Sequence, residues 1–115
     1  MKIKEVNAQL LKGTLDGALL LVISQAETYG YEITEKLEKM GFLSIAVGTI
    51  YPILQKLERE KYITGQLCAS SEGPQRKYFS LSDKGQDRLK KFLADWTYLT
   101  EAMASLIREC ENNGR

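Results

Sequence analysis

Basic and polar side chains gather in two short stretches in the middle of the chain. Residues 48–60 read GTIYPILQKLERE, and residues 73–79 read GPQRKYF. Lys56 in the first stretch, with Arg76 and Lys77 in the second, can donate hydrogen bonds to phosphate oxygens, and the neighbouring amides can bond base edges. The chemistry that these residue types indicate is recognition of a nucleic acid.

Catalytic chemistry has little support in the composition. The chain has no histidine, so Ser-His and Cys-His nucleophiles and the commonest metal ligand are missing. It has neither a Gly-x-x-x-x-Gly-Lys phosphate loop nor a Gly-x-Gly-x-x-Gly fingerprint. Cys68 and Cys110 are too far apart in sequence to indicate a metal site or a disulfide framework. We expect no enzyme, no catalytic residue, no metal, no cofactor, and two reduced thiols.

Length and charge favour one small domain. The 115 residues are 43% hydrophobic and 27% charged, which is ordinary for a globular protein, although a chain this short can need a partner to complete its core. The net charge is only +1, but residues 43–80 carry five basic and three acidic side chains. The longest apolar run, residues 18–23, is too short to cross a membrane, and residues 1–5 lack the features of a secretory signal. We expect a cytoplasmic protein without membrane contact.

Two helices are expected before the basic region. Residues 6–25 are apolar nearly all round, which predicts a helix buried on more than one side. After Gly30, the spacing of Ile33, Leu37 and Met40 predicts a helix with one core-facing stripe, which Gly41 ends.

A third helix should present the first basic stretch. Ser44 is its expected N-cap, and Pro52 should bend it without ending it. The core-facing positions are Val47, Ile50, Leu54 and Leu57. The opposite face, which would be offered to a DNA groove, holds Ile45, Gly48, Thr49, Pro52, Gln55, Lys56 and Arg59.

The rest of the chain predicts a hairpin and a long helix. Residues 61–68 and 76–81 flank a turn-forming segment and indicate an antiparallel hairpin, and Ser82 should cap the helix that follows. Apolar residues in that helix step by three and four and predict a coiled-coil seam: Leu89, Phe92, Trp96, Leu99, Met103, Leu106 and Cys110. The expected fold is mainly α with a small β-hairpin, a winged helix-turn-helix (residues 1–81) forming one compact unit with a C-terminal dimerisation helix (residues 82–115).

Three blocks of the sequence resemble the PadR family of transcriptional regulators, in its short form with one C-terminal helix. The blocks are residues 29–33, residues 48–52 with Leu54, Leu57 and Glu58, and residues 73–79 with Leu81 and Gly85. The resemblance implies a dimeric winged-helix repressor, relieved in many members by a small molecule, with its third helix in the major groove and its wing on flanking backbone. The positions that match family residues near DNA are Thr49, Tyr51, Lys56, Arg76 and Lys77. Lys61 departs from the pattern, which usually has glycine there, and is costly if the backbone is left-handed.

These observations together give a set of expected DNA contacts, with alternative roles for some of the residues and one rival function. The contacts are Tyr31, Thr49, Tyr51, Gln55, Lys56, Arg59, Gln75, Arg76 and Lys77. For Arg76 and Lys77 the alternative is a solvated hairpin end, and for Tyr51 it is core packing. The rival function is a winged-helix module that binds protein without DNA, which weaker salt dependence would reveal.

Dimerisation and effector binding are expected around the last helix. The predicted dimer interface comprises Leu15, Leu19, Leu89, Phe92, Trp96, Leu99, Met103, Leu106 and Cys110. A large indole in such a seam can hold two helices apart and leave an aromatic hollow, so Trp96, Phe92 and Leu99 are candidates for binding a small aromatic effector. Interface packing of Trp96 is the alternative.

Overall fold

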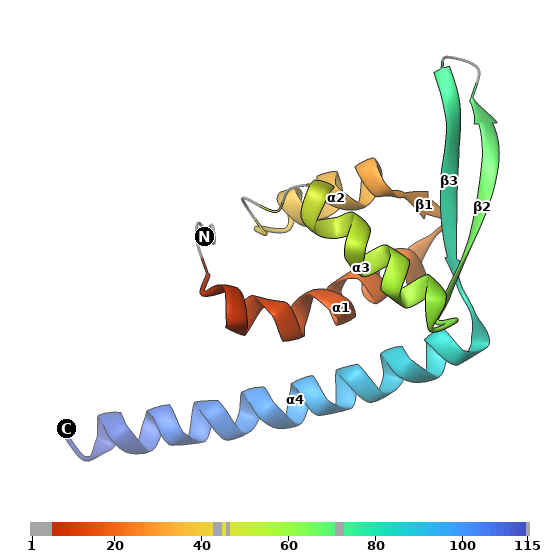
Figure 1. The fold of residues 1–115 in the computed structure, drawn as a ribbon. Helices are drawn as coiled ribbons and strands as arrows, with labels where there is room; N and C mark the ends of the chain where they lie inside the picture. The colour runs from red at the N-terminus through yellow and green to blue at the C-terminus, as the bar shows by residue number, and fades with distance from the viewer. Residues whose placement is uncertain (1–5, 43–44, 46, 71–72, 115) are drawn as a thin grey trace.

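The computed structural model describes residues 6–42, 45, 47–70 and 73–114 as four helices and a small sheet (Figure 1). The elements in chain order are α1 (Ala8–Gln25), β1 (Thr28–Tyr29), α2 (Gly30–Lys39), α3 (Val47–Arg59), β2 (Ile63–Ser70), β3 (Gly73–Leu81) and α4 (Asp83–Asn112). Three helices and a projecting β2–β3 hairpin make a winged helix-turn-helix, and α4 follows it. The predicted fold class is confirmed.

The sheet has three strands rather than the two that were expected. Its order is β1-β3-β2, with both pairs antiparallel, and β1 sets Thr28 opposite Phe79 and Tyr29 opposite Tyr78. A strand of two residues carries no alternation to recognise, and only pairing with β3 defines it. The hairpin itself is confirmed, with β2 beginning two residues later than predicted.

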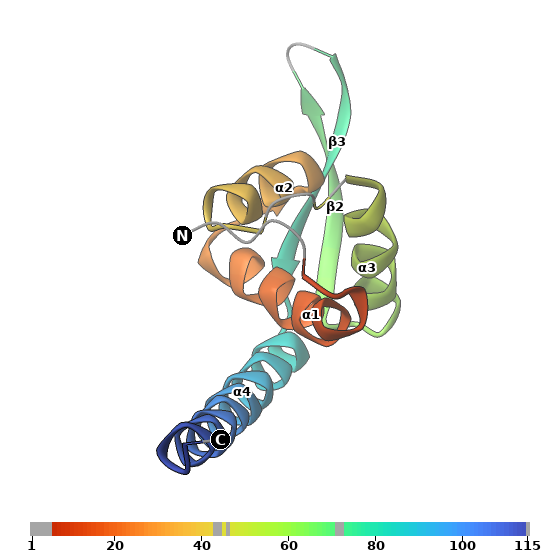
Figure 2. The same cartoon turned by 90° about the vertical axis from the view of Figure 1, so that its left-hand side faces the viewer.

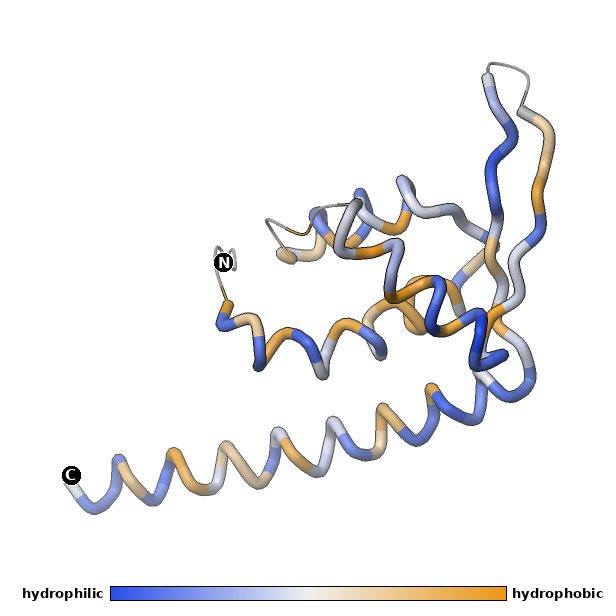
Figure 3. The backbone as a smooth tube through the Cα atoms, in the orientation of Figure 1, coloured by the Kyte–Doolittle hydropathy of each residue, from blue (hydrophilic) through white to orange (hydrophobic). Residues whose placement is uncertain are grey.

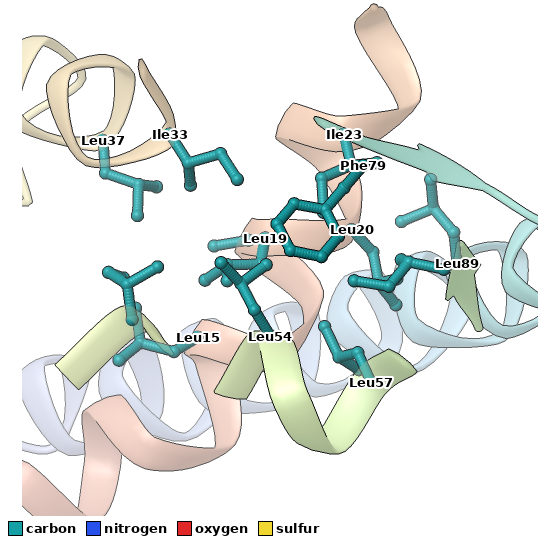
Figure 4. Packing of buried hydrophobic residues seen from close by; sticks show 13 residues of the cluster. Leu15, Leu19, Leu20, Ile23, Ile33, Leu37, Leu54, Leu57, Phe79 and Leu89 are labelled. Atoms are coloured by element: carbon teal, nitrogen blue, oxygen red, sulfur yellow. The ribbon is translucent and has the colours of Figure 1, made fainter. Parts of the chain in front are cut away.

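Apolar side chains from all four helices, β2 and β3 meet in one core (Figure 4). The helix α1 crosses its middle, and the buried residues include Leu15, Leu19, Leu20, Ile23, Ile33, Leu37, Ile50, Leu54, Leu57, Ile63, Phe79 and Leu89. The placement of Leu15 and Leu19 in a dimer interface is wrong, because both are buried inside this chain's own core. Leu89 is likewise at the edge of that core, 9% exposed.

The helix α3 follows the predicted pattern over most of its length. Ile50, Leu54 and Leu57 are buried, and Pro52 lies exposed inside the helix without ending it. Ile45 differs from the expectation, since it packs against the core rather than lying on the opposite face. The expected N-cap Ser44 and the side chain of Val47 lie outside the described residues.

The helices α2 and α3 end in the same way. In each helix, a carbonyl oxygen of the last turn accepts a hydrogen bond from the N–H of the residue five positions later. Phe42 N–H donates to Leu37 O, and Tyr62 N–H donates to Leu57 O, both at 2.9 Å. This termination needs a left-handed residue just beyond the helix. Gly41 (φ 109°) serves α2, as predicted, but α3 uses Lys61 (φ 70°).

Met40 corrects one detail of α2. It is 64% exposed rather than core-facing. The helix has already ended at Lys39, so Met40 lies at the rim beyond the last helical residue, where the stripe through Ile33 and Leu37 no longer continues.

The start of α4 is bonded to the turn between α3 and β2. The Ser82 hydroxyl accepts from Gly85 N–H at 3.0 Å, as the predicted N-cap, and lies 2.7 Å from the Lys61 carbonyl oxygen, to which it can donate. A β-carbon on Gly85 would lie 1.9 Å from the Tyr62 carbonyl oxygen. Glycine is therefore required for this close approach.

The molecule is elongated, with extents of 61 × 30 × 20 Å. The hairpin and α4 leave the helical body on opposite sides, as the two perpendicular views agree (Figures 1 and 2). The C-terminal part of α4 lies beyond the body (Figure 1). Within the part of the chain that is described, no helix combines the length and the apolar character needed to span a bilayer.

Candidate nucleic-acid interface

A cleft of about 350 Å³ lies between α3 and the hairpin, next to the start of α2. It brings together five of the expected contact residues from segments far apart in sequence: Tyr51, Gln55, Gln75, Arg76 and Lys77. Figure 3 shows the outer part of β3 as a hydrophilic stretch beside the more apolar β2. The cleft therefore combines amide, phenol and cationic donors in one place.

Tyr51 crosses from α3 to the start of α2. A β-carbon on Gly30 would lie 3.0 Å from the Tyr51 hydroxyl oxygen, so the ring packs closely on this turn. The side chain is nevertheless 47% exposed. Tyr51 is thus both packed against Gly30 and partly accessible.

The two hairpin cations have different partners. The Arg76 guanidinium carbon lies 4.6 Å from the centroid of the Tyr29 ring. Lys77 Nζ lies 2.8 Å from Glu58 Oε1, in an ion pair whose two side chains are 45% and 31% exposed. Lys77 therefore carries a partly neutralised charge, whereas Arg76 contacts an uncharged aromatic face.

The remaining expected residues lie outside the cleft lining. Thr49 and Arg59 are exposed on α3, and Tyr31 is exposed in the first turn of α2. Lys56 differs from the helical-wheel expectation. Its ammonium group pairs with Asp16 Oδ2 of α1 at 2.5 Å, because this edge of α3 packs beside α1 rather than facing outward.

Sequence reasoning missed two side chains of the cleft that contact its cations. Tyr29 and Glu58 both line it, Tyr29 beneath Arg76 and Glu58 beside Lys77. Glu58 carries a carboxylate, which cannot donate a hydrogen bond to phosphate, so the sequence gave no reason to include it among the DNA contacts. Tyr29 was recognised only as part of a family block, because its position next to Arg76 depends on the unpredicted pairing of β1 with β3.

A second, apolar cavity of about 390 Å³ lies among α1, α2 and α4. Phe92 and Trp96 both line it, and their rings stack with centroids 6.1 Å apart. Leu99 does not reach this cavity but lines a neighbouring one of about 330 Å³ with the same two aromatic residues. The three candidate effector residues are thus adjacent, although they are divided between two hollows.

The predicted seam of α4 separates into an inner and an outer part. Leu89 and Phe92 pack on this chain's own core, and the Phe92 ring covers Gly17 of α1 so closely that a β-carbon there would lie 2.2 Å from it. The outer part is exposed in the single chain and comprises Trp96, Leu99, Met103, Leu106 and Cys110. Within the predicted seam, this outer part holds most of the apolar surface left for a second molecule.

The comparison with known proteins agrees with this architecture. Residues 19–91 match the model of the transcriptional regulator PadR-like family. The crystal structure of a PadR-like transcriptional regulator from Bacillus cereus is similar, with 45% identity, a TM-score of 0.79, and coverage of 87% of this chain and 97% of that chain.

Two comparisons point to a longer relative in Bacillus subtilis. The negative transcriptional regulator PadR is 33% identical over 94 residues, which are 80% of this chain and 50% of that protein. The crystal structure of PadR in complex with operator DNA is similar with 30% identity and a TM-score of 0.65, covering 70% of this chain and 46% of that chain. This chain spans about half the length of that relative.

Proposed function

We propose a function for this chain on the basis of its family, since it belongs to the PadR-like family of transcriptional regulators. In this proposal it is a repressor that binds an inverted-repeat operator in double-stranded DNA as a homodimer. The observation that carries the proposal is the cleft in which α3 and the hairpin bring Gln55, Arg76 and Lys77 together. Further support comes from the relative in Bacillus subtilis, which is a negative regulator and was crystallised with operator DNA. The family consists of transcriptional regulators rather than enzymes.

The contact residues divide by chemistry. In the proposed complex α3 enters the major groove, where exposed Thr49, Gln55 and Arg59 reach toward base edges. Arg76 and Lys77 contact phosphates flanking the groove, with Tyr51 and Tyr31 as further phosphate donors. Lys56 contributes only if its pair with Asp16 opens.

The second subunit is proposed to pack on the outer part of α4. Trp96, Leu99, Met103 and Leu106 are between 43% and 61% exposed and recur at heptad spacing. Covering this stripe removes apolar surface from water, which is the usual driving force for association. A two-fold dimer would place two copies of α3 against half-sites about 34–36 Å apart.

A small aromatic effector is proposed to bind at the cavity beside Trp96. The cavity is lined mainly by apolar side chains, and stacked Phe92 and Trp96 supply the aromatic faces that planar molecules prefer. Because α4 carries both this cavity and the dimer stripe, binding there would change the spacing of the two copies of α3 and lower DNA affinity.

DNA titration tests the main proposal. Duplexes from the gene's own upstream region are titrated at two salt concentrations with wild-type protein, with Arg76→Ala/Lys77→Ala, and with Lys90→Ala/Lys91→Ala on α4 as the matched charge control. We expect wild-type affinity to fall steeply with salt, with a smaller slope for the hairpin variant alone. Equal binding by the two double variants, or binding that ignores salt, would contradict the proposal and favour the protein-binding alternative.

The subunit and effector proposals need separate measurements. Leu99→Glu should shift the sedimentation coefficient from dimer to monomer, while exposed Tyr98→Glu, outside the seam, should not. Trp96 is the only tryptophan in the chain, so its fluorescence reports directly on the cavity. A panel of planar cations and phenolic acids that leaves this fluorescence unchanged would remove the effector from the proposal.

A further inference from the structure

The guanidinium of Arg76 has a fixed aromatic support. Its central carbon lies 4.6 Å from the centroid of the Tyr29 ring, inside the range of a cation–π interaction. An aromatic ring accepts no conventional hydrogen bond from the guanidinium, so this contact leaves N–H donors of Arg76 available to another group. An exposed arginine without such support would spread over many rotamers, so the ring reduces the conformational freedom that Arg76 must lose on binding.

Tyr29 is itself held in place by a neighbouring ring and by the backbone on either side of it. Tyr29 pairs with Tyr78 across the β1–β3 ladder, and the two rings meet edge to face with centroids 5.2 Å apart. Its neighbour Thr28 is buried and donates a hydrogen bond to Glu32 Oε1 at 3.0 Å. The helix α2 begins immediately after Tyr29, at Gly30. The support is therefore part of the framework rather than a mobile side chain.

The neighbouring cation shows the contrast. Lys77 is ion-paired with Glu58 at 2.8 Å, so a phosphate that binds Lys77 must compete with a carboxylate. Arg76 is held without any opposing charge in this contact. Among the described residues Arg76 forms no ion pair, so of the two hairpin cations it is the one whose charge is not offset by a carboxylate.

We propose that Tyr29 is a positioning residue for DNA binding, which holds Arg76 at the cleft between α3 and the hairpin so that its donors meet a backbone phosphate. This inference rests on the proposed DNA-binding function and assigns a role in it to a residue of β1. It also ranks the hairpin cations, since loss of Arg76 should weaken DNA binding more than loss of Lys77.

The test compares Tyr29→Leu, which removes the aromatic face, with Tyr29→Phe, which keeps it. An exposed cation–π contact corresponds to about a two- to fivefold change in affinity per site, hence about five- to thirtyfold for a dimer with two wings. We expect this loss for Tyr29→Leu and less than a twofold change for Tyr29→Phe. In an Arg76→Ala background, Tyr29→Leu should have no further effect, as in a double-mutant cycle for two coupled residues.

The matched control is Tyr62→Leu, which removes another cation–π contact, that of Lys84 at 4.9 Å. This contact lies next to the base of the hairpin, away from the cleft. It should leave DNA affinity unchanged, and thermal melts of every variant establish the folded fraction. A Tyr29→Leu variant that binds like wild type, or that loses affinity equally with and without Arg76, would overturn the inference while wild-type binding still supports the proposed function. Wild-type protein that binds no DNA overturns both.

Discussion

Replacement of Lys61 by glycine should give a more stable protein than replacement by alanine. Lys61 is the left-handed residue that ends α3, with φ at 70°, and its N–H and that of Tyr62 donate to Glu58 O and Leu57 O at 2.9 Å. A residue with a β-carbon in this conformation is strained by about 1–2 kcal/mol. Glycine removes that strain but gains about 0.4–1 kcal/mol of conformational freedom in the unfolded chain. The net stabilisation relative to alanine is about 1 kcal/mol.

The alanine variant separates backbone strain from charge. Lys61→Ala keeps the strain and loses the lysine charge, whose attraction to the helix C-terminus is about 0.3–1 kcal/mol. Both variants lose this attraction, so Lys61→Gly should be more stable than Lys61→Ala by the backbone term alone, and Lys61→Ala should be no more stable than wild type. For a domain of this size, 1 kcal/mol corresponds to about 4 °C in melting temperature.

Urea unfolding and calorimetry at one fixed protomer concentration measure these differences, since association would otherwise shift the midpoint. The matched control uses Arg59, the last residue of α3, where the backbone is helical. There the Arg59→Gly variant should be less stable than the Arg59→Ala variant. The reasoning would be refuted if Lys61→Gly were no more stable than Lys61→Ala.

Three further predictions concern contacts that hold the elements together. Gly85→Ala should lower the free energy of unfolding by about 3 kcal/mol, measured by urea unfolding, because the new methyl group overlaps the Tyr62 carbonyl oxygen. Ser82→Ala should lower it by about 1 kcal/mol through loss of the α4 N-cap, and Ser82→Asp, which can still accept, should recover part of it. Asp16→Asn should cost less than about 1 kcal/mol in the same assay and, by freeing Lys56, raise DNA affinity at low salt.

Local sequence patterns were sufficient for the main elements. The period of apolar residues predicted the four helices within a few residues of their observed ends, and Ser82 was recognised as the cap of α4. The three blocks that resemble the PadR family led to the family that the comparison confirmed. The left-handed backbone suspected at Lys61 is present, because helix termination depends on nearby residues alone.

Tertiary structure decided the features that join distant segments. The pairing of β1 with β3 places Tyr29 beneath Arg76, and the crossing of α1 and α3 brings Asp16 to Lys56; neither has a local signal. Likewise, the apolar period of α1 cannot say which molecule covers Leu15 and Leu19, and packing within one chain buried them. Sequence determines which face of a helix is apolar, whereas the partner of that face is chosen by the competing packing of all elements at once.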